Sequence, residues 1–282
     1  MTVADYLLPT SVPEAVDLLG AHGPELLVIA GGTVAMPLIN EGISLPRRVM
    51  GLRRVGLDQI WRLGDELHIG ATATLTSLTA QTDVPLLARA AERTGAWAVR
   101  NMGTVGGNLF TPPPGGDVAT ALLALDARVV VTGPTGPREV PLAAFWTGFM
   151  TTALAADELV TSILVPVDRG RTAFVKLGRR AANTPAVVTV AVHGTFDGGT
   201  VNAARIALGA VGPHPLRMAR AEAAITGTGL DEAAISAAAT LAAEDADPDD
   251  DAVASAWYRR RMAGVFVRRA LQDLAVQAGR SF

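Results

Sequence analysis

The sequence predicts an α+β protein whose C-terminal part becomes helical, and two patterns carry that prediction. Over the first 167 residues, short apolar segments of strand character alternate with segments of helical periodicity. After the polar segment "VDRGR" (167–171), three further strand segments precede Ala-rich helical sequence. Strands and helices that are mixed first and segregated later are typical of an α+β plan, and the change of pattern places a boundary near 168–171.

The first expected element is a helix over residues 11–23. Ser11 is a candidate N-cap, Pro13 and Glu14 suit a first helical turn, and Gly23 follows the last apolar residue. This short segment therefore contains both a start signal and a stop signal for a helix.

The other elements are assigned by periodicity and by the glycines and prolines that bound them. The assignments in chain order are strands at 25–33, within 46–56 and at 66–75, a helix over 84–99, the helix "VATALLAL" after Asp117, a hairpin over 127–142 with its loop at Gly133–Gly136, strands at 158–167, 172–179, 186–196 and 204–211, helical sequence from about 215, and a long helix over 255–276.

Composition excludes several classes of function. The 282 residues are 49% apolar and 18% charged, with a net charge of −3, which argues against a general nucleic-acid binder. The chain has no cysteine, so it cannot itself hold disulfides, thiol nucleophiles or iron–sulfur clusters. Its four histidines are scattered, and no metal site is expected. No apolar run approaches the roughly 20 residues of a membrane span, and no signal peptide is apparent, so the cytoplasm is the expected location.

Two glycine pairs follow apolar segments, "AGGT" at 30–33 and "TVGGN" at 104–108. Because glycine lacks a Cβ, successive N–H groups can converge on an anion without steric cost. Two such loops, about seventy residues apart, suit the two charges of a pyrophosphate. The alternative, that each pair is a simple turn at a strand end, stays open for either pair taken alone.

The second glycine pair leads into "LFTPPPGGD" (109–117), which reads as a rigid, extended connector. It delivers Asp117 to the start of an apolar helix, where the carboxylate would either cap the helix or bind a ribose or ribityl hydroxyl. Of the 24 basic residues, only Lys176 is a lysine. A specific role for this ammonium is therefore weighed against an ordinary surface position.

Two charged segments have plainer readings. The acidic run at 244–251 is interpreted as a solvated loop, because Pro248 and the missing glycine and terminal glutamate spoil a calcium loop. The long C-terminal helix carries five arginines that would form a solvated face or, alternatively, meet a partner. These are Arg259, Arg260, Arg261, Arg268 and Arg269.

"AGGT" followed by "VRNMGTVGGNLF…GGDVATALLALDARVVV" resembles the signature of the FAD-binding medium subunit of the molybdenum hydroxylases, the family of xanthine dehydrogenase and aerobic carbon monoxide dehydrogenase. "YLLPTSVPEAVDLLGAHG", "LRRVG", "DELVTSILVPV", "AFVKLGRR" and "WYRRRMAGVFVRRAL" follow in the order such subunits show, so the resemblance covers essentially the whole chain. It implies a PCMH-type (vanillyl-alcohol-oxidase-like) fold, with FAD-binding subdomains at 1–56 and 57–168 and a C-terminal sheet-and-helix domain at 169–282.

The resemblance also implies residue roles. Residues 29–34 (Ile29, Ala30, Gly31, Gly32, Thr33 and Val34) and 104–108 (Thr104, Val105, Gly106, Gly107 and Asn108) would wrap the pyrophosphate of FAD, and Asp117 would bind cofactor hydroxyls. Val160 and Lys176 would lie nearer the isoalloxazine, where a fixed cation would favour the reduced, anionic ring. Partner subunits would carry molybdopterin and two [2Fe–2S] clusters, and the flavin would pass electrons to NAD⁺, a quinone or oxygen.

Two positions depart from the family pattern. Val34 stands where many relatives have a polar residue, and Asn183-Thr184-Pro185 stands where the family usually has an acidic residue followed by a small one. The second departure leaves the electron acceptor open. Two other functions are therefore kept beside the electron relay: a stand-alone FAD-dependent oxidoreductase acting on a small metabolite, and a scaffold subunit that has lost its flavin.

Overall fold

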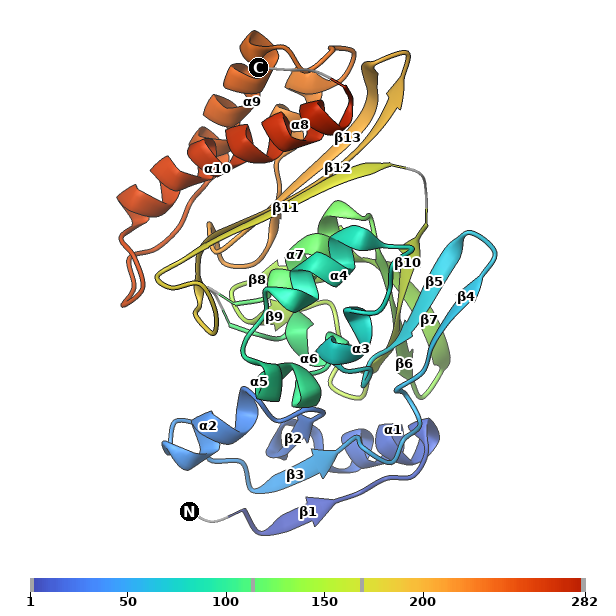
Figure 1. Ribbon diagram of the computed structural model, residues 1–282. Helices are drawn as coiled ribbons and strands as arrows, with labels where there is room; N and C mark the ends of the chain where they lie inside the picture. The colour runs from blue at the N-terminus through green and yellow to red at the C-terminus, as the bar shows by residue number, and fades with distance from the viewer. Residues whose placement is uncertain (1–2, 113–114, 168–169, 280–282) are drawn as a thin grey trace.

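The computed structural model describes residues 3–112, 115–167 and 170–279, and three main sheets carry the fold within them (Figure 1). The N-terminal sheet is parallel, in the order β1–β3–β2, and two helices connect its strands. Ser11 caps the first of these helices as predicted, its hydroxyl accepting the Glu14 N–H at 3.3 Å. The elements are β1 (Asp5–Leu7), α1 (Val12–His22), β2 (Leu26–Ile29), α2 (Ala35–Asn40) and β3 (Arg48–Gly51).

The middle sheet is antiparallel, in the order β4–β5–β10–β6–β7. Its central strand β10 comes last in the chain and pairs with both β5 and β6. Its strands are β4 (Ile60–Leu63), β5 (Glu66–Gly70), β6 (Arg128–Gly133), β7 (Gly136–Pro141) and β10 (Leu159–Pro166), and a small hairpin of β8 (Trp146–Gly148) and β9 (Thr151–Thr152) precedes β10.

Five helices lie between β5 and β6 in the chain. The last of them is buried along its whole length and contacts a neighbouring helix on one side and the C-terminal sheet on the other. This arrangement explains why "VATALLAL" is apolar all round. The five helices are α3 (Leu75–Leu78), α4 (Pro85–Glu92), α5 (Trp97–Met102), α6 (Val105–Leu109) and α7 (Asp117–Ala124).

The C-terminal sheet is antiparallel, in the order β11–β12–β13–β14, and lies between α7 and a layer of three helices (Figure 1). Along β12, Val188, Val190 and Val192 pack into the core shared with those helices, whereas Ala191 packs into the core around α7. Both faces of the strand are therefore buried, with the period of two expected of a strand. The elements are β11 (Arg171–Gly178), β12 (Ala186–Asp197), β13 (Thr200–Gly209), β14 (Leu216–Arg217), α8 (Ala219–Ile225), α9 (Glu232–Asp245) and α10 (Ala256–Gln277).

The α+β expectation is confirmed, and most predicted elements are found, but two assignments are wrong. The helix expected over 84–99 is two helices, because Gly95 adopts a φ of +58° and turns the chain between α4 and α5. The strand expected over 66–75 ends at Gly70, and Thr74 begins α3 as its N-cap.

The charged segments also differ from their plain readings. Glu244 and Asp245 end α9, and Asp251 pairs with Arg259, so the acidic run is not simply a solvated loop. Arg259 is 1% exposed and does not belong to a solvated face of α10.

Two features expected from the sequence fall on segments that are not described. Part of the proline connector (113–114) and part of the expected boundary (168–169) lie outside the described residues. No helix of the described chain is long and apolar enough to cross a membrane.

Candidate functional site

The first glycine loop follows β2, and several of its backbone N–H groups are not used in hydrogen bonds. Within the described residues, no hydrogen bond is formed by the N–H groups of the four residues from Gly31 to Val34. The next turn begins only when the Met36 N–H donates to the carbonyl of Gly32 at 2.9 Å. These residues are partly exposed, so an anion could reach the donors. Ile29 and Ala30 form the base of the loop, with Ile29 8% exposed.

The first glycine loop packs against residues 102–103, which lead directly into the second. A Cβ placed on Gly31 would lie 2.0 Å from the carbonyl oxygen of Met102 and 2.9 Å from the Cα of Gly103. A Cβ on Gly103 would in turn lie 3.4 Å from the hydroxyl of Thr33. Only glycine permits this approach of two main chains, and the approach brings together segments about seventy residues apart in the sequence.

The second glycine loop is different from the expectation, because its backbone donors are already used. The N–H groups of Val105 and Gly106 donate to the carbonyls of Ala73 and Ala71, each at 2.9 Å. The Gly107 N–H donates to the Thr104 hydroxyl at 3.1 Å, which caps α6. The idea that these N–H groups converge on an anion is therefore wrong for this loop. The part of this loop that a ligand could contact is the exposed Cα of Gly107, which lies beside the buried Asn108.

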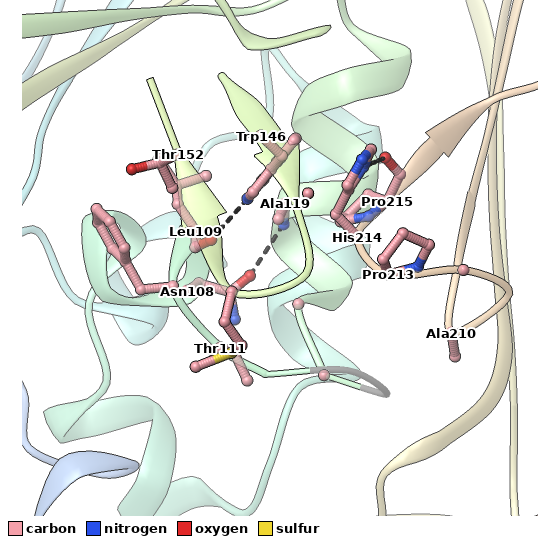
Figure 2. A pocket seen from close by; sticks show the side chains of 16 residues that line it. Asn108, Leu109, Thr111, Ala119, Trp146, Thr152, Ala210, Pro213, His214 and Pro215 are labelled. Atoms are coloured by element: carbon pink, nitrogen blue, oxygen red, sulfur yellow. Dashed lines mark hydrogen bonds between the residues drawn. The ribbon is translucent and has the colours of Figure 1, made fainter. Parts of the chain in front are cut away.

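That asparagine, Asn108, has one half of its amide engaged. Its Oδ1 accepts the Ala119 N–H at 2.9 Å, so it satisfies a free donor in the first turn of α7 (Figure 2). Its Nδ2 has no hydrogen-bond partner among the described residues. Nδ2 is not among the buried unpaired polar atoms of the described chain, so this donor is accessible from the surface and available to a ligand.

Asp117 and Lys176 form a buried ion pair. Lys176 Nζ lies 2.5 Å from Asp117 Oδ2, and the two side chains are 6% and 7% exposed. Thr189 Oγ1 donates to the other carboxylate oxygen at 2.7 Å, and Lys176 also donates to the carbonyl of Arg93 at 3.2 Å. The alternative that Asp117 caps α7 is wrong, because the N-cap residue is Gly116, which has no side chain to form a capping hydrogen bond.

The structure places the remaining candidates apart from these clusters. Val160 is 4% exposed and packs into the core of the middle sheet. Val34 is 37% exposed and is the N-cap residue of α2, where its apolar side chain forms no capping hydrogen bond. In the segment after β11, Arg180 donates to the carbonyl of Asn183, which holds a φ of +48°.

A pocket opens beside Asn108, between the start of α7, the β8–β9 hairpin and residues 210–215 (Figure 2). Trp146 donates to the carbonyl of Leu109 at 2.9 Å, and its ring stacks on that of His214 with centroids 5.9 Å apart. Asn108 is the one predicted site residue in its described lining.

Sequence reasoning missed two partners of the ion pair. Thr189 lies within the apolar run "AVVTVAV", where a single threonine gives little signal, and Arg93 contributes only its carbonyl. Neither role follows from local sequence, because each depends on a contact across the fold.

Known protein families and relatives match this chain over almost its whole length. Residues 2–168 match the family model described as the FAD binding domain in molybdopterin dehydrogenase, and residues 173–274 match that of the CO dehydrogenase flavoprotein C-terminal domain. The carbon monoxide dehydrogenase medium chain of Hydrogenophaga pseudoflava is 34% identical, over 95% of each chain. The glyceraldehyde dehydrogenase medium chain of Sulfolobus acidocaldarius is 29% identical, over 96% of this chain and 98% of its own length.

The fold agrees equally well with a solved structure. Reconstituted CO dehydrogenase from Oligotropha carboxidovorans contains a chain that superposes with a TM-score of 0.93, at 32% identity, over 96% of this chain and 97% of that one.

Proposed function

Since the chain belongs to the family of FAD-binding subunits of molybdopterin dehydrogenases, we propose that its two glycine loops together hold the diphosphate of the cofactor. The chain binds FAD and is the FAD-dependent oxidoreductase subunit of a molybdenum hydroxylase-type dehydrogenase. The flavin, when bound, takes up electrons and passes them on.

The approach of Gly31 to the Met102–Gly103 backbone is the observation that supports this placement most directly. It sets the free N–H groups of residues 31–34 beside the segment that carries Gly107 and the unused Nδ2 of Asn108. In this proposal the first loop, 29–34, supplies the backbone donors, and the second, 104–108, supplies an open backbone surface and one side-chain donor. An anionic diphosphate suits such a set of uncharged donors.

The Lys176–Asp117 pair would border the flavin end of the same cofactor. Its position at the contact between α7 and β11–β12 places it where the FAD-binding part and the C-terminal part of the chain meet. The Asp117 carboxylate would accept hydrogen bonds from hydroxyls of the cofactor, and the Lys176 ammonium would place a positive charge near the flavin ring. Val160, on β10, would contribute through its backbone rather than its buried side chain.

In our proposal the subunit relays electrons between partner subunits and an acceptor. The absence of cysteine from the sequence means that iron–sulfur clusters would be held by another chain. Relatives named as medium chains serve enzymes of different substrates, carbon monoxide and glyceraldehyde. We therefore expect an iron–sulfur subunit and a molybdopterin subunit as partners, the latter choosing the substrate, with NAD⁺, a quinone or oxygen as acceptor.

The comparisons do not favour the stand-alone oxidoreductase, because relatives that match over almost their whole length are medium chains of larger enzymes. A scaffold without flavin would have no use for the unbonded donors of residues 31–34. The divisions at residues 56 and 168, and the cytoplasmic location, remain part of the proposal.

The test is to express the chain alone and together with its genomic neighbours. Alone, it should bind FAD and exchange electrons with NADH or a dye, but it should not oxidise an organic substrate. Together, it should co-purify with a cysteine-rich subunit and a molybdopterin subunit, and the substrate of that complex should reduce its flavin. Full turnover of an organic substrate by the single chain would overturn the relay.

A further inference from the structure

Arg259 is a buried arginine that no function described so far employs. It lies in the first turn of α10, is 1% exposed, and is the largest of the fully buried side chains in the described chain. Burying a guanidinium costs several kcal/mol unless the charge is paired and its donors are satisfied. A plain packing position on a helix would be filled more stably by an apolar side chain, so the groups that Arg259 contacts are informative.

One end of the guanidinium is neutralised by the acidic segment. A single nitrogen of the guanidinium, NH2, lies 2.8 Å from both carboxylate oxygens of Asp251, while the buried Nε has no partner in the described chain. Asp251 also accepts the N–H groups of Val253 and Ala254, at 2.8 and 3.0 Å. The carboxylate is thus held by its own loop and is a rigid partner for the arginine.

The other end binds three backbone carbonyls of the C-terminal sheet. Arg259 NH1 donates to Ala186, Val187 and Ala210, at 3.1, 2.9 and 3.1 Å. These carbonyls lie at two irregular points of the sheet. The β11–β12 register shifts so that Val187 has no partner residue in β11, and Ala210 follows β13 with a φ of +65°.

The bulge at Val187 lies next to the ion pair assigned to the cofactor. Two residues further along β12 stands Thr189, which donates to Asp117 and is the register partner of Lys176 in β11. At about 3.3 Å per residue, Ala186 and Val187 lie roughly 7–10 Å from Thr189 along the strand. Lys176 and Thr189 thus belong to the regular part of the β11–β12 ladder, and the bulge begins one pair beyond them, after Leu177 and Val188.

We propose that Arg259, held by Asp251, is a positioning residue that locks the β11–β12 bulge and so places Lys176 and Thr189 at the flavin. The inference rests on the proposed function only in assigning Lys176 and Asp117 to the cofactor. Arg179, just after β11, adds a contact on the other side of this segment, because its NH1 donates to the carbonyl of Ala252, the residue after Asp251, at 3.3 Å.

The experiment compares Arg259→Met with Arg260→Met in the full chain. Arg260 is the next residue of α10, and its ion pair with Asp247 is exposed, with side chains 46% and 93% accessible. The readings, taken well below the melting temperature, are the dissociation constant for FAD and the visible circular dichroism of the bound flavin. For Arg259→Met we expect about tenfold weaker FAD binding, as for other residues that orient a binding group, and a changed dichroism. Arg260→Met should match the wild type in both.

Lys176→Met, measured in parallel, distinguishes a failure of the proposed flavin site from a failure of the positioning role of Arg259. If Lys176→Met alters the flavin while Arg259→Met changes only the melting temperature, the positioning role is wrong and the proposed site stands. If neither variant alters the flavin, both the site and the positioning role are wrong. Should Arg259→Met fail to fold, Arg259→Lys keeps a positive charge beside Asp251, but its single nitrogen cannot reach both Asp251 and the three carbonyls. An unchanged flavin in that variant would likewise overturn the inference.

Discussion

Lys176 and Asp117 are 59 residues apart in the sequence, yet their side chains form a 2.5 Å ion pair that joins β11 of the C-terminal sheet to the first residue of α7. Lys176, the sole lysine of the chain, thus has a specific partner. The pair has no net charge, so a substitution that removes one partner leaves a single charge of known sign at the site. The pair is therefore suited to testing how local charge acts on the flavin.

Lys176→Met should lower the reduction potential of the bound flavin. The substitution leaves an unpaired carboxylate, and a negative charge disfavours the electron-rich reduced ring. We expect a decrease on the order of 30 mV, which for two electrons corresponds to about 1.4 kcal/mol. Loss of one partner of a buried pair should also reduce the free energy of unfolding by about 3–5 kcal/mol. Redox titration against reference dyes and chemical denaturation measure the two effects.

Asp117→Asn is the matched control, since it leaves the ammonium and should raise the same potential. The double variant Lys176→Met/Asp117→Asn restores a neutral site, so its potential should return toward that of the wild type. Potentials that do not respond to either single substitution would remove the pair from the neighbourhood of the flavin.

Gly107→Val should abolish FAD retention in a folded protein. The added Cβ would meet only the Thr104 hydroxyl, at 2.9 Å, and the rest of the side chain would occupy the exposed surface assigned to the diphosphate. The absorbance of flavin in the purified protein and far-UV circular dichroism report the two properties. A Gly107→Val variant that remains yellow would mean that the diphosphate lies elsewhere.

The adjacent glycine gives the contrasting result. A Cβ on Gly106 would lie 2.7 Å from the carbonyl oxygen of Ala71. The N–H of Gly106 already donates to this oxygen. Gly106→Ala should therefore lower the free energy of unfolding by about 1–3 kcal/mol, the usual cost of overpacking, and lose flavin only as a consequence.

Asn108→Asp should separate the two ends of the asparagine side chain. The carboxylate keeps an acceptor for the Ala119 N–H in the first turn of α7, where negative charge is favourable, so stability should be at least that of the wild type. The donor assigned to the cofactor is lost, and the new charge would oppose the diphosphate, so FAD should bind at least about tenfold more weakly. Asn108→Ala should instead lose both flavin and about 1–3 kcal/mol of stability. Equal FAD affinity in Asn108→Asp and the wild type would contradict the assignment of Nδ2.

The sequence predicted what depends on local chemistry. The Ser11 cap, the hairpin over 127–142 and the strand character of β10–β13 are encoded in neighbouring residues, and the structure contains them. The close approach of Gly31 to the Met102–Gly103 backbone was not predicted, since the glycine pairs alone are equally consistent with two separate turns. The division of α4 from α5 was not predicted either, since Gly95 sits in a sequence whose apolar spacing continues on either side.

Contacts over long sequence distances were beyond local reasoning. Five arginines of α10 look alike in the sequence, and Arg259 differs only because its acceptors come from β12 and from the residue after β13, 49 to 73 residues away. Likewise, the use of the Val105 and Gly106 donors by Ala73 and Ala71 depends on how α6 packs, which no glycine pattern reveals.

The Asp251–Arg259 pair should make part of the stability depend on acidic pH. Burial alone raises the pKa of Asp251, but hydrogen bonds from the Ala254 N–H, the Arg259 guanidinium and the Val253 N–H outweigh it and hold the pKa below its ordinary value of 3.8. A carboxyl with a lowered pKa in the folded state stabilises the protein fully above its unfolded pKa, and that contribution is lost as the pH falls through the folded one. Denaturation midpoints between pH 7 and pH 3 should therefore fall less steeply below about pH 4 for Asp251→Asn than for the wild type. Parallel pH profiles for the two proteins would show that Asp251 contributes nothing to acid sensitivity.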